Sequence, residues 1–151
     1  MSAPLKIYTA RPISGCDYEE IETYYYDLER ILLRCKYIVL CPMTGLDYLR
    51  IKKVMDAVGY PNHPGATEKA IVSRDKWLVK MSDVVLVDLS SAKEVSIGCI
   101  FELAWAHDNG KHTVVVMGED NVHHHSFVLE CADVLFNTLE EALQYLEQLT
   151  L

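Results

Sequence analysis

Glu102 is a carboxylate in an unusual setting. It belongs to the segment SIGCIFELAWA, residues 96–106, which is otherwise largely apolar and follows the apolar run VVLVDLS. A carboxylate in such a segment is either a solvated helix residue or a group that faces a ligand. Beside an anchored ligand it can act as a nucleophile or as a general base. Position alone leaves both alternatives open.

The residues that precede Glu102 could anchor an anion. Ser96, Ile97 and Gly98 are predicted to open a helix. The free N–H groups of a helix N-terminus, together with the helix dipole, form an anion site. Glu102 follows one to two turns later, so it would point at whatever the anion anchors.

Strands and helices are predicted to alternate along the chain. The run DVVLVDL has the unbroken apolar pattern of a strand buried on both faces. Asp17 is a predicted N-cap, and Gly110 is predicted to close the helix of Glu102. Of the three tyrosines at 24–26, two should face the core and one the solvent. The predicted strands are residues 5–10, 37–42, 83–89, 113–117 and 134–136, and the predicted helices are residues 17–34, 66–81, 97–109 and 139–149.

This alternation predicts one doubly wound α/β domain over residues 1–151, with a five-stranded parallel sheet and helices on both faces, of the flavodoxin or Rossmann kind. Ligands of such folds bind at the carboxyl ends of the strands. The site should therefore be lined by residues that follow strands one, three and four, among them Tyr8 and Arg11. Asp75 lies on the helix before strand three and could reach the same edge.

Residues 44–64 are less regular. They contain LDYLRIKKVMDAVG, which could form a helix, and then the turn-rich YPNHPG. The segment is either a variable loop over the site or a plain connector.

Composition and charge exclude several classes of protein. The net charge is -8 and no run of Lys or Arg exists, so a nucleic-acid polymer is not an expected partner. An acidic protein can still bind a phosphate through local donors. No run approaches the roughly 20 apolar residues of a membrane span. Since MSAPLKIY has no apolar signal region, we expect a cytoplasmic protein without a membrane partner, and the five cysteines, which form no C-x-x-C pair, are expected to be buried free thiols.

The HHH run at residues 123–125 resembles a metal tract. Consecutive residues rarely converge on one ion, and no Cys or Asp at ligand spacing accompanies the run. We therefore predict no metal, and we expect the run at the mouth of the site or at a dimer contact. The chain also has no G-K-[ST] phosphate loop and no dinucleotide fingerprint, so no cofactor is predicted.

Four segments resemble the nucleoside 2-deoxyribosyltransferase family, and most of all its branch of nucleoside 5′-monophosphate N-glycosidases. The resemblance covers nearly the whole chain, apart from about residues 44–67. The segments are KIYTARPISG, RDKWLVKMSDVVLVDLS, SIGCIFELAWAHDNGKHTVVV and HHHSFVLECADVLFNTLEEAL.

The resemblance implies catalytic roles for three residues. The family's nucleophile, a glutamate that attacks C1′ of the sugar and forms a covalent glycosyl-enzyme, falls on Glu102. The tyrosine that orients this carboxylate falls on Tyr8, and the aspartate that assists departure of the base falls on Asp75. The chemistry fits, because a carboxylate can stabilise and then trap an oxocarbenium-like state with net retention.

One position separates the substrates within the family. The transferases typically have an aspartate six residues before the glutamate, which holds a free 5′-hydroxyl. Here that residue is Ser96, whose hydroxyl can donate to a 5′-phosphate. The hydrolase branch adds a serine from the neighbouring subunit, which falls on Ser126. The resemblance thus implies a phosphate cradle of these serines and the N–H groups of Gly98 and Cys99, with Arg11 either beside it or on the surface.

Other positions are assigned to the sugar and the base. Arg11-Pro12 replaces the family's common Gly-Pro, and Pro12 is counted with the substrate-binding residues. Ile13 and Met43, with Tyr48, are expected to line the pocket of the base. Cys99 is bulky for a residue near the 2′ position and favours a 2′-deoxy sugar, although ribose and the identity of the base stay open.

The expected function is cleavage of the N-glycosidic bond of a (2′-deoxy)nucleoside 5′-monophosphate through a covalent glycosyl-glutamate, with water as the usual acceptor. One alternative is a nucleoside 2-deoxyribosyltransferase, which moves the deoxyribose between bases. Another is a nucleotide-binding module without turnover. The expected partners are a small nucleotide or nucleoside and, as in the family, at least one further copy of the chain in a homodimer or higher homo-oligomer.

Overall fold

Five apolar segments pair into one parallel sheet in the computed structural model, which describes residues 2–46, 49, 54–56 and 58–151. The order of the strands is β2-β1-β3-β4-β5, and every neighbouring pair is parallel. This order is that of flavodoxin-like doubly wound folds, so the predicted fold class is confirmed. The strands are β1 (Lys6–Ala10), β2 (Ile38–Leu40), β3 (Val84–Asp88), β4 (His112–Val116) and β5 (Val134–Phe136).

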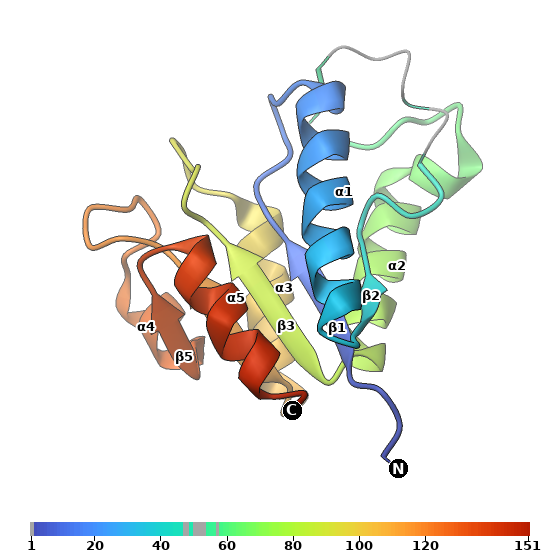
Figure 1. The fold of residues 1–151 in the computed structure, drawn as a ribbon. Helices are drawn as coiled ribbons and strands as arrows, with labels where there is room; N and C mark the ends of the chain where they lie inside the picture. Colours follow the sequence, from blue (N-terminus) through green and yellow to red (C-terminus); the bar gives the residue numbers. More distant parts are fainter. Residues whose placement is uncertain (1, 47–48, 50–53, 57) are drawn as a thin grey trace.

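Helices cover both faces of the sheet (Figure 1). One layer, in front in Figure 1, is α1 (Tyr18–Arg34) and α5 (Leu139–Gln148); the other, behind the sheet, is α2 (Glu68–Met81), α3 (Ile97–Asp108) and α4 (Ser126–Cys131), and a short 3-10 helix, η2 (Pro64–Ala66), precedes α2. The helices of each layer pack against the sheet and form a separate apolar cluster with it. All five residues of β3 are buried, because the strand has neighbours on both edges and helices on both faces.

The ends of the helices follow their capping residues. The Asp17 side chain accepts from the N–H groups of Glu19 and Glu20 and starts α1, as predicted. Gly110 follows the end of α3 with φ +66°, a left-handed conformation that favours glycine. Within α1, Tyr25 is buried and Tyr26 is exposed, with Tyr24 half-buried, so the predicted orientation of the three tyrosines is confirmed.

Two details differ from the sequence prediction. The six-residue helix α4 was not predicted, and it follows the histidine run directly, with the His125 side chain accepting from Phe127 N–H at its start. The cysteines are free, as expected, but only Cys99 is fully buried and the other four are half-buried.

The segment between β2 and α2 packs against the loop after β1. Gly15 N–H donates to Met55 O and Met55 N–H donates to Cys16 O, both at 2.9 Å. Ile13 and Met43 pack against a small buried cluster of Tyr18, Leu46, Leu49, Met55, Tyr60 and Ala66. The segment therefore lies beside the carboxyl edge of the sheet. Tyr48 and half of the helix predicted over residues 46–59 fall on residues 47–48, 50–53 and 57, outside the described residues. Residues 54–56 are not helical, since Val54 forms an isolated antiparallel bridge with Asp17, so the prediction of a helix is wrong there.

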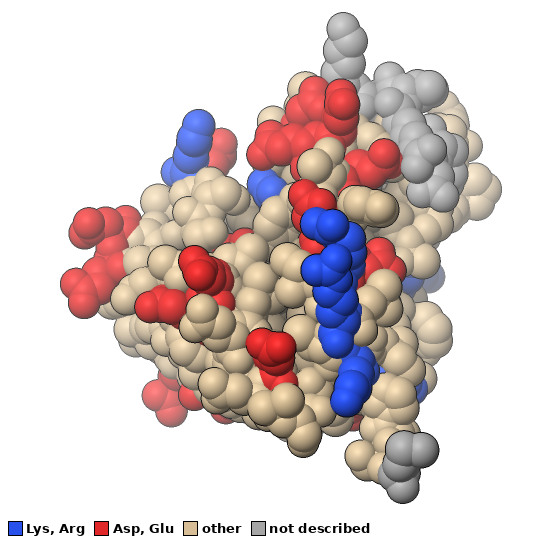
Figure 2. Space-filling model, in the orientation of Figure 1, with Lys and Arg blue, Asp and Glu red and all other residues tan. Residues whose placement is uncertain are grey.

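Charges on the front layer are mixed. Figure 2 shows a narrow column of basic side chains along α1, which carries the exposed Arg30 and Arg34, with acidic side chains around it. A phosphate would thus have to be bound by local donors rather than by a broad basic surface. None of the described helices is both long and apolar enough to cross a membrane.

Candidate active site

A buried hydrogen bond joins β1 to α3 at the carboxyl edge of the sheet. Tyr8 OH donates to Glu102 Oε1 at 2.7 Å. Glu102 shares the inward face of α3 with Cys99, Leu103 and Ala106, and it is only 8% exposed. The alternative of a solvated helix carboxylate is therefore excluded. Glu102 Oε2 has no hydrogen-bond partner among the described residues, so one oxygen is oriented and the other is available to a ligand.

Asp75 reaches the same place from α2. It lies one turn before Leu78 and Val79, which pack in the cluster that contains Tyr8, and it is 8% exposed. Arg74 donates to Asp75 Oδ1 from Nε at 3.2 Å and from Nη2 at 3.1 Å. The same Nη2 donates to Pro42 O at 2.8 Å, which ties α2 to the end of β2.

Arg74 was not predicted as a site residue. Its only signal in the sequence is its position next to Asp75, and adjacent helix residues do not usually share a face. Asp75 Oδ2 has no hydrogen-bond partner among the described residues, so it can contact a ligand while Arg74 holds the other oxygen.

The two carboxyl groups share a low-dielectric site. Burial and, to a smaller extent, the nearby Asp75 together raise the pKa of Glu102 to about 8, whereas the hydrogen bond from Tyr8 and the charge of Arg74 oppose the rise. Burial also raises the pKa of Asp75 to about 6, against the opposing effect of the Arg74 charge. Between these values the pair holds one proton. The proton lies mainly on Glu102, whose pKa is the higher, and a shift of this proton to Asp75 would leave Glu102 ionised as a nucleophile and Asp75 protonated as an acid.

The N-terminus of α3 offers unpaired donors. Among the described residues, no acceptor is present for the N–H groups of Ile97 and Gly98. A Cβ added to Gly98 would meet nothing within 4 Å, so the space beside this amide is open. Ser96 Oγ accepts from Cys99 N–H at 3.4 Å. This differs from the prediction, since the Cys99 amide is used in capping and the free amides are those of Ile97 and Gly98.

Arg11 lies beneath this edge and not on the surface. It is 7% exposed, and its guanidinium stacks over the Tyr24 ring at 4.6 Å from the centroid. Arg11 Nε donates to Pro12 O at 3.2 Å and Nη2 donates to Ser91 Oγ at 3.4 Å. A carboxylate oxygen of the exposed Glu20 lies 3.5 Å from Nη2. The surface alternative for Arg11 is therefore excluded.

A third buried carboxyl group, that of Asp88, organises the loop after β3. Asp88 accepts from Tyr24 OH at 2.7 Å and from Ser90 N–H at 3.0 Å. The phenol of Tyr24 thus supports Arg11 with its ring and Asp88 with its hydroxyl. Asp88 was expected at this edge of the sheet, but Tyr24 was not predicted as a site residue, because the contact joins positions 64 residues apart in the chain.

The remaining predicted residues lie around this edge. Pro12 contributes its carbonyl oxygen to Arg11, and Ile13 and Met43 belong to the cluster beside the loop after β1. Ser126 is exposed at the first residue of α4. Of the histidine run, His124 and His125 are exposed, whereas His123 is buried and accepts from Ser96 N–H at 2.7 Å.

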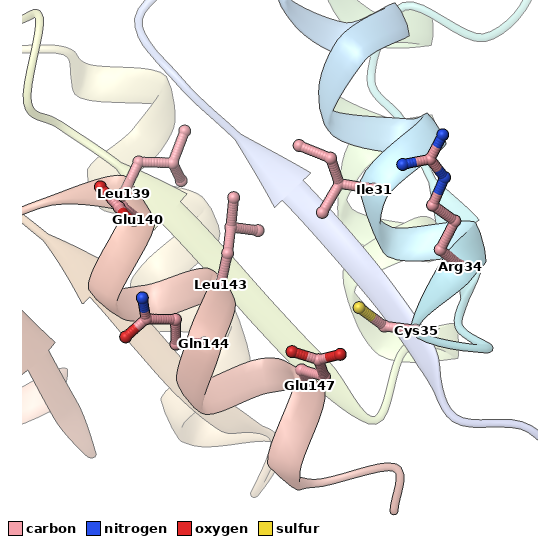
Figure 3. Close-up of a pocket in the computed structure, with 8 residues that line it drawn as sticks. All are labelled: Ile31, Arg34, Cys35, Leu139, Glu140, Leu143, Gln144 and Glu147. Carbon is pink, nitrogen blue, oxygen red and sulfur yellow. The ribbon is translucent and has the colours of Figure 1, made fainter.

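A separate groove of about 560 Å³ lies between α1 and α5. Figure 3 shows Ile31 of α1 and Cys35, the residue after this helix, facing Leu143 and Glu147 of α5 across it. No predicted site residue lines this groove, so it is not the candidate active site.

Known proteins resemble this chain in structure, whereas comparisons of sequence find no match. No protein-family model and no curated protein matches its sequence. A conserved protein of Enterococcus faecalis V583 has a similar structure, with a TM-score of 0.66 and 19% identity over 97% of this chain and 99% of that one. A 2-deoxyribosyltransferase of Bacillus psychrosaccharolyticus has a TM-score of 0.64 and 16% identity, over 93% of this chain and 91% of that one.

A CMP N-glycosidase of Clostridium botulinum also has a similar structure. Its TM-score is 0.57 and its identity 17%, over 95% of this chain and 98% of that one. The resemblance to the nucleoside 2-deoxyribosyltransferase family is therefore confirmed at the level of the fold. A fold hosts many functions, so the function has to be argued from the site.

Proposed function

We propose that the chain is an N-glycosidase of the nucleoside 2-deoxyribosyltransferase family that hydrolyses a nucleoside 5′-monophosphate to free base and sugar phosphate. The observation that carries the proposal is the buried carboxyl pair. Glu102 is oriented by Tyr8 through one oxygen, and Asp75 is close enough to raise its pKa. A structural role alone does not account for two buried carboxyl groups that each leave one oxygen unpaired, because burying unpaired charge is costly.

The first half of the reaction forms the covalent intermediate. The shared proton first passes from Glu102 to Asp75, and the ionised Glu102 Oε2 then attacks C1′ of the sugar as the bond from C1′ to the base nitrogen breaks. The electron pair of that bond goes to the base, which takes a proton from Asp75. Tyr8 OH stays on Oε1 and holds the carboxylate under C1′, where it stabilises the oxocarbenium-like charge before the ester bond forms.

The second half releases the sugar. Water attacks C1′ from the side that the base has left, and its proton passes to the Asp75 carboxylate. The ester bond to Glu102 breaks and its electron pair returns to the carboxylate. Two inversions give net retention at C1′, and both side chains regain their starting protonation.

The 5′-phosphate distinguishes this reaction from base exchange. An aspartate at position 96 would repel a phosphate, whereas Ser96 can donate its hydroxyl proton, because Ser96 Oγ already accepts from Cys99 N–H. The open space at Gly98 and the unpaired amide there favour an anion at the helix N-terminus. The buried charge of Arg11 adds a cation at the same edge. The likeness to a CMP N-glycosidase is in keeping with a nucleotide substrate.

A second copy of the chain is part of the proposal. Ser126 would donate to the phosphate of the neighbouring subunit. Helices α3 and α4 are in contact and expose three large apolar side chains, Ile97, Phe101 and Phe127, by 70%, 55% and 79%. Large exposed apolar side chains of this kind are typical of surfaces that pack against another chain.

Base exchange is the second candidate, because the transferase of Bacillus psychrosaccharolyticus has a higher TM-score than the CMP N-glycosidase, 0.64 against 0.57. A transferase would use the same Glu102 intermediate and would replace the water with a second base. The identity of the acceptor therefore decides between the two candidates.

A chromatographic assay for free base tests the proposal. Each common nucleoside and each 5′-monophosphate, in ribose and deoxyribose form, is incubated with and without a second base. Base released from monophosphates regardless of the acceptor is the expected result. A new nucleoside formed only when the acceptor base is present would make the chain a transferase. Binding of nucleotides without any release would leave a binding module and overturn the proposal.

A further inference from the structure

The loop between β4 and α4 encloses a histidine that the reaction described above does not use. His123 is 2% exposed, although its neighbours His124 and His125 are exposed. Burial lowers the pKa of His123, which favours the neutral ring. A buried histidine needs partners for both ring nitrogens, and these partners define what it does.

The hydrogen bonds of His123 fix its tautomer. Ser96 N–H donates to His123 Nε2 at 2.7 Å, so Nε2 carries no proton. The proton is therefore on Nδ1, which donates to Asn121 Oδ1 at 3.0 Å. Asn121 also accepts from His123 N–H at 3.0 Å, and its Nδ2 donates to Leu89 O at 2.8 Å. A continuous set of hydrogen bonds thus runs from Leu89, which follows β3, through Asn121 and His123 to Ser96, the N-cap of α3.

These bonds determine where Ser96 points. Ser96 is the N-cap of α3, with φ -91° and ψ 102°. Its main chain is held by His123, and its Oγ accepts from Cys99 N–H. The main-chain oxygen of Ser96 accepts from Ile100 N–H, so the Ser96 hydroxyl proton, which lies beside the Cys99 thiol, is the donor of this residue that a phosphate could recruit together with the amides of Ile97 and Gly98.

We infer that His123 is a positioning residue for recognition of the 5′-phosphate, which it serves by holding the Ser96 main chain so that the Ser96 hydroxyl faces the phosphate. The inference rests on the proposed function, since it assigns the part of the loop that sets the choice between monophosphate and nucleoside. His123 does not touch the substrate. It makes the donor set at the start of α3 rigid before the phosphate arrives, and such preorganisation increases affinity.

Two variants of similar size separate this role from simple packing. His123→Gln can place Oε1 near the position of Nε2 and so keep an acceptor for Ser96 N–H. His123→Met fills the same space and offers no such acceptor. His124→Met is the matched control, because His124 is exposed and the hydrogen bond to Ser96 is made by His123 instead. Thermal unfolding of all three shows that each is folded before kinetics are compared.

The readouts are the KM and kcat for the monophosphate, and the inhibition constant of the product sugar 5-phosphate. His123→Met is expected to raise both the KM and the inhibition constant ~10-fold, the equivalent of one lost hydrogen bond, with kcat changed much less. His123→Gln should recover most of the loss, and His124→Met should behave as wild type. If the wild-type protein released no base, the proposed function itself would be contradicted. Wild-type protein that releases base, with equal constants for the Met and Gln variants, would overturn only the inference about His123.

Discussion

The carboxylate of Glu102 links catalysis to stability at the scale of the single residue. Its pKa is raised to about 8 in the folded protein, first by burial and then by Asp75. The folded state therefore binds the proton more tightly than the unfolded state. This contribution to stability is fully present below the unfolded pKa and is lost as the pH rises through about 8.

Glu102→Gln is expected to abolish turnover and to stabilise the fold at alkaline pH. Glutamine cannot form the glycosyl ester, so the rate should fall by at least ~10³-fold. Its amide keeps an acceptor for Tyr8 OH and cannot ionise, so the free energy of unfolding at pH 9 should exceed that of wild type by on the order of 1–3 kcal/mol. Thermal or denaturant unfolding at pH 5 and pH 9 measures the difference. Equal stability of the two proteins at pH 9 would contradict the burial of an ionisable Glu102.

Asp75 should determine the alkaline limb of the pH profile. If Asp75 and Glu102 hold one proton between them, kcat should be largest between about 6 and about 8, the pKa values of the pair, and should fall on either side. Asp75→Asn removes the acid, so the alkaline limb should disappear while the acid limb remains. The comparison between the two proteins cancels the titration of the substrate phosphate itself. An unchanged alkaline limb in Asp75→Asn would assign proton donation to another group.

At the scale of the element, helix α3 joins the proposed anion site to the proposed nucleophile. Its first turn carries the free amides, and its second turn carries Glu102, so one rigid helix sets the distance from phosphate to C1′. The open space at Gly98 suits an anion that approaches the backbone closely.

Gly98→Ala should separate folding from binding. Alanine is the better helix former, and its Cβ meets nothing in the unliganded protein, so the free energy of unfolding should rise by ~0.5–1 kcal/mol. The same methyl group would occupy the space of the phosphate and should raise the KM for the monophosphate at least ~10-fold. Calorimetric unfolding and steady-state kinetics on the same preparation measure both effects. A stabilised variant with an unchanged KM would place the phosphate elsewhere.

The sequence predicts the helices and strands better than it predicts the contacts between distant side chains. The strands and the helix of Glu102 follow from apolar runs, a capping residue and a glycine, which are local signals. Helix α4 escapes prediction because it is short and begins in the polar histidine run. The bonds of His123 to Ser96 and of Arg74 to Pro42 cannot be read from spacing, because each joins residues that only the folded sheet edge brings together. Tyr8, Asp75 and Glu102 were predicted through the family resemblance rather than from periodicity.

The whole molecule is expected to act as an assembly whose subunits complete one another's sites. If Ser126 binds the phosphate of the neighbouring subunit, a mixture of Glu102→Gln and Ser126→Ala proteins should be more active than either alone. Equal mixing gives heterodimers in which one site has both residues intact, or about a quarter of all sites. Activity is measured after unfolding and refolding the mixture together, with separately refolded proteins as the control. Absence of any gain would contradict a shared site, as would a fully active monomer in light scattering.

The covalent intermediate on Glu102 is the most direct test of the account. A 2′-fluoro monophosphate, whose fluorine slows both halves of the reaction, is incubated with the protein and the mixture is quenched and digested. Mass spectrometry is predicted to find one fluorosugar phosphate on the peptide that contains Glu102, and on none of the peptides from Glu102→Gln. Release of base from the ordinary substrate with inversion at C1′, and with no adduct on Glu102, would contradict the account.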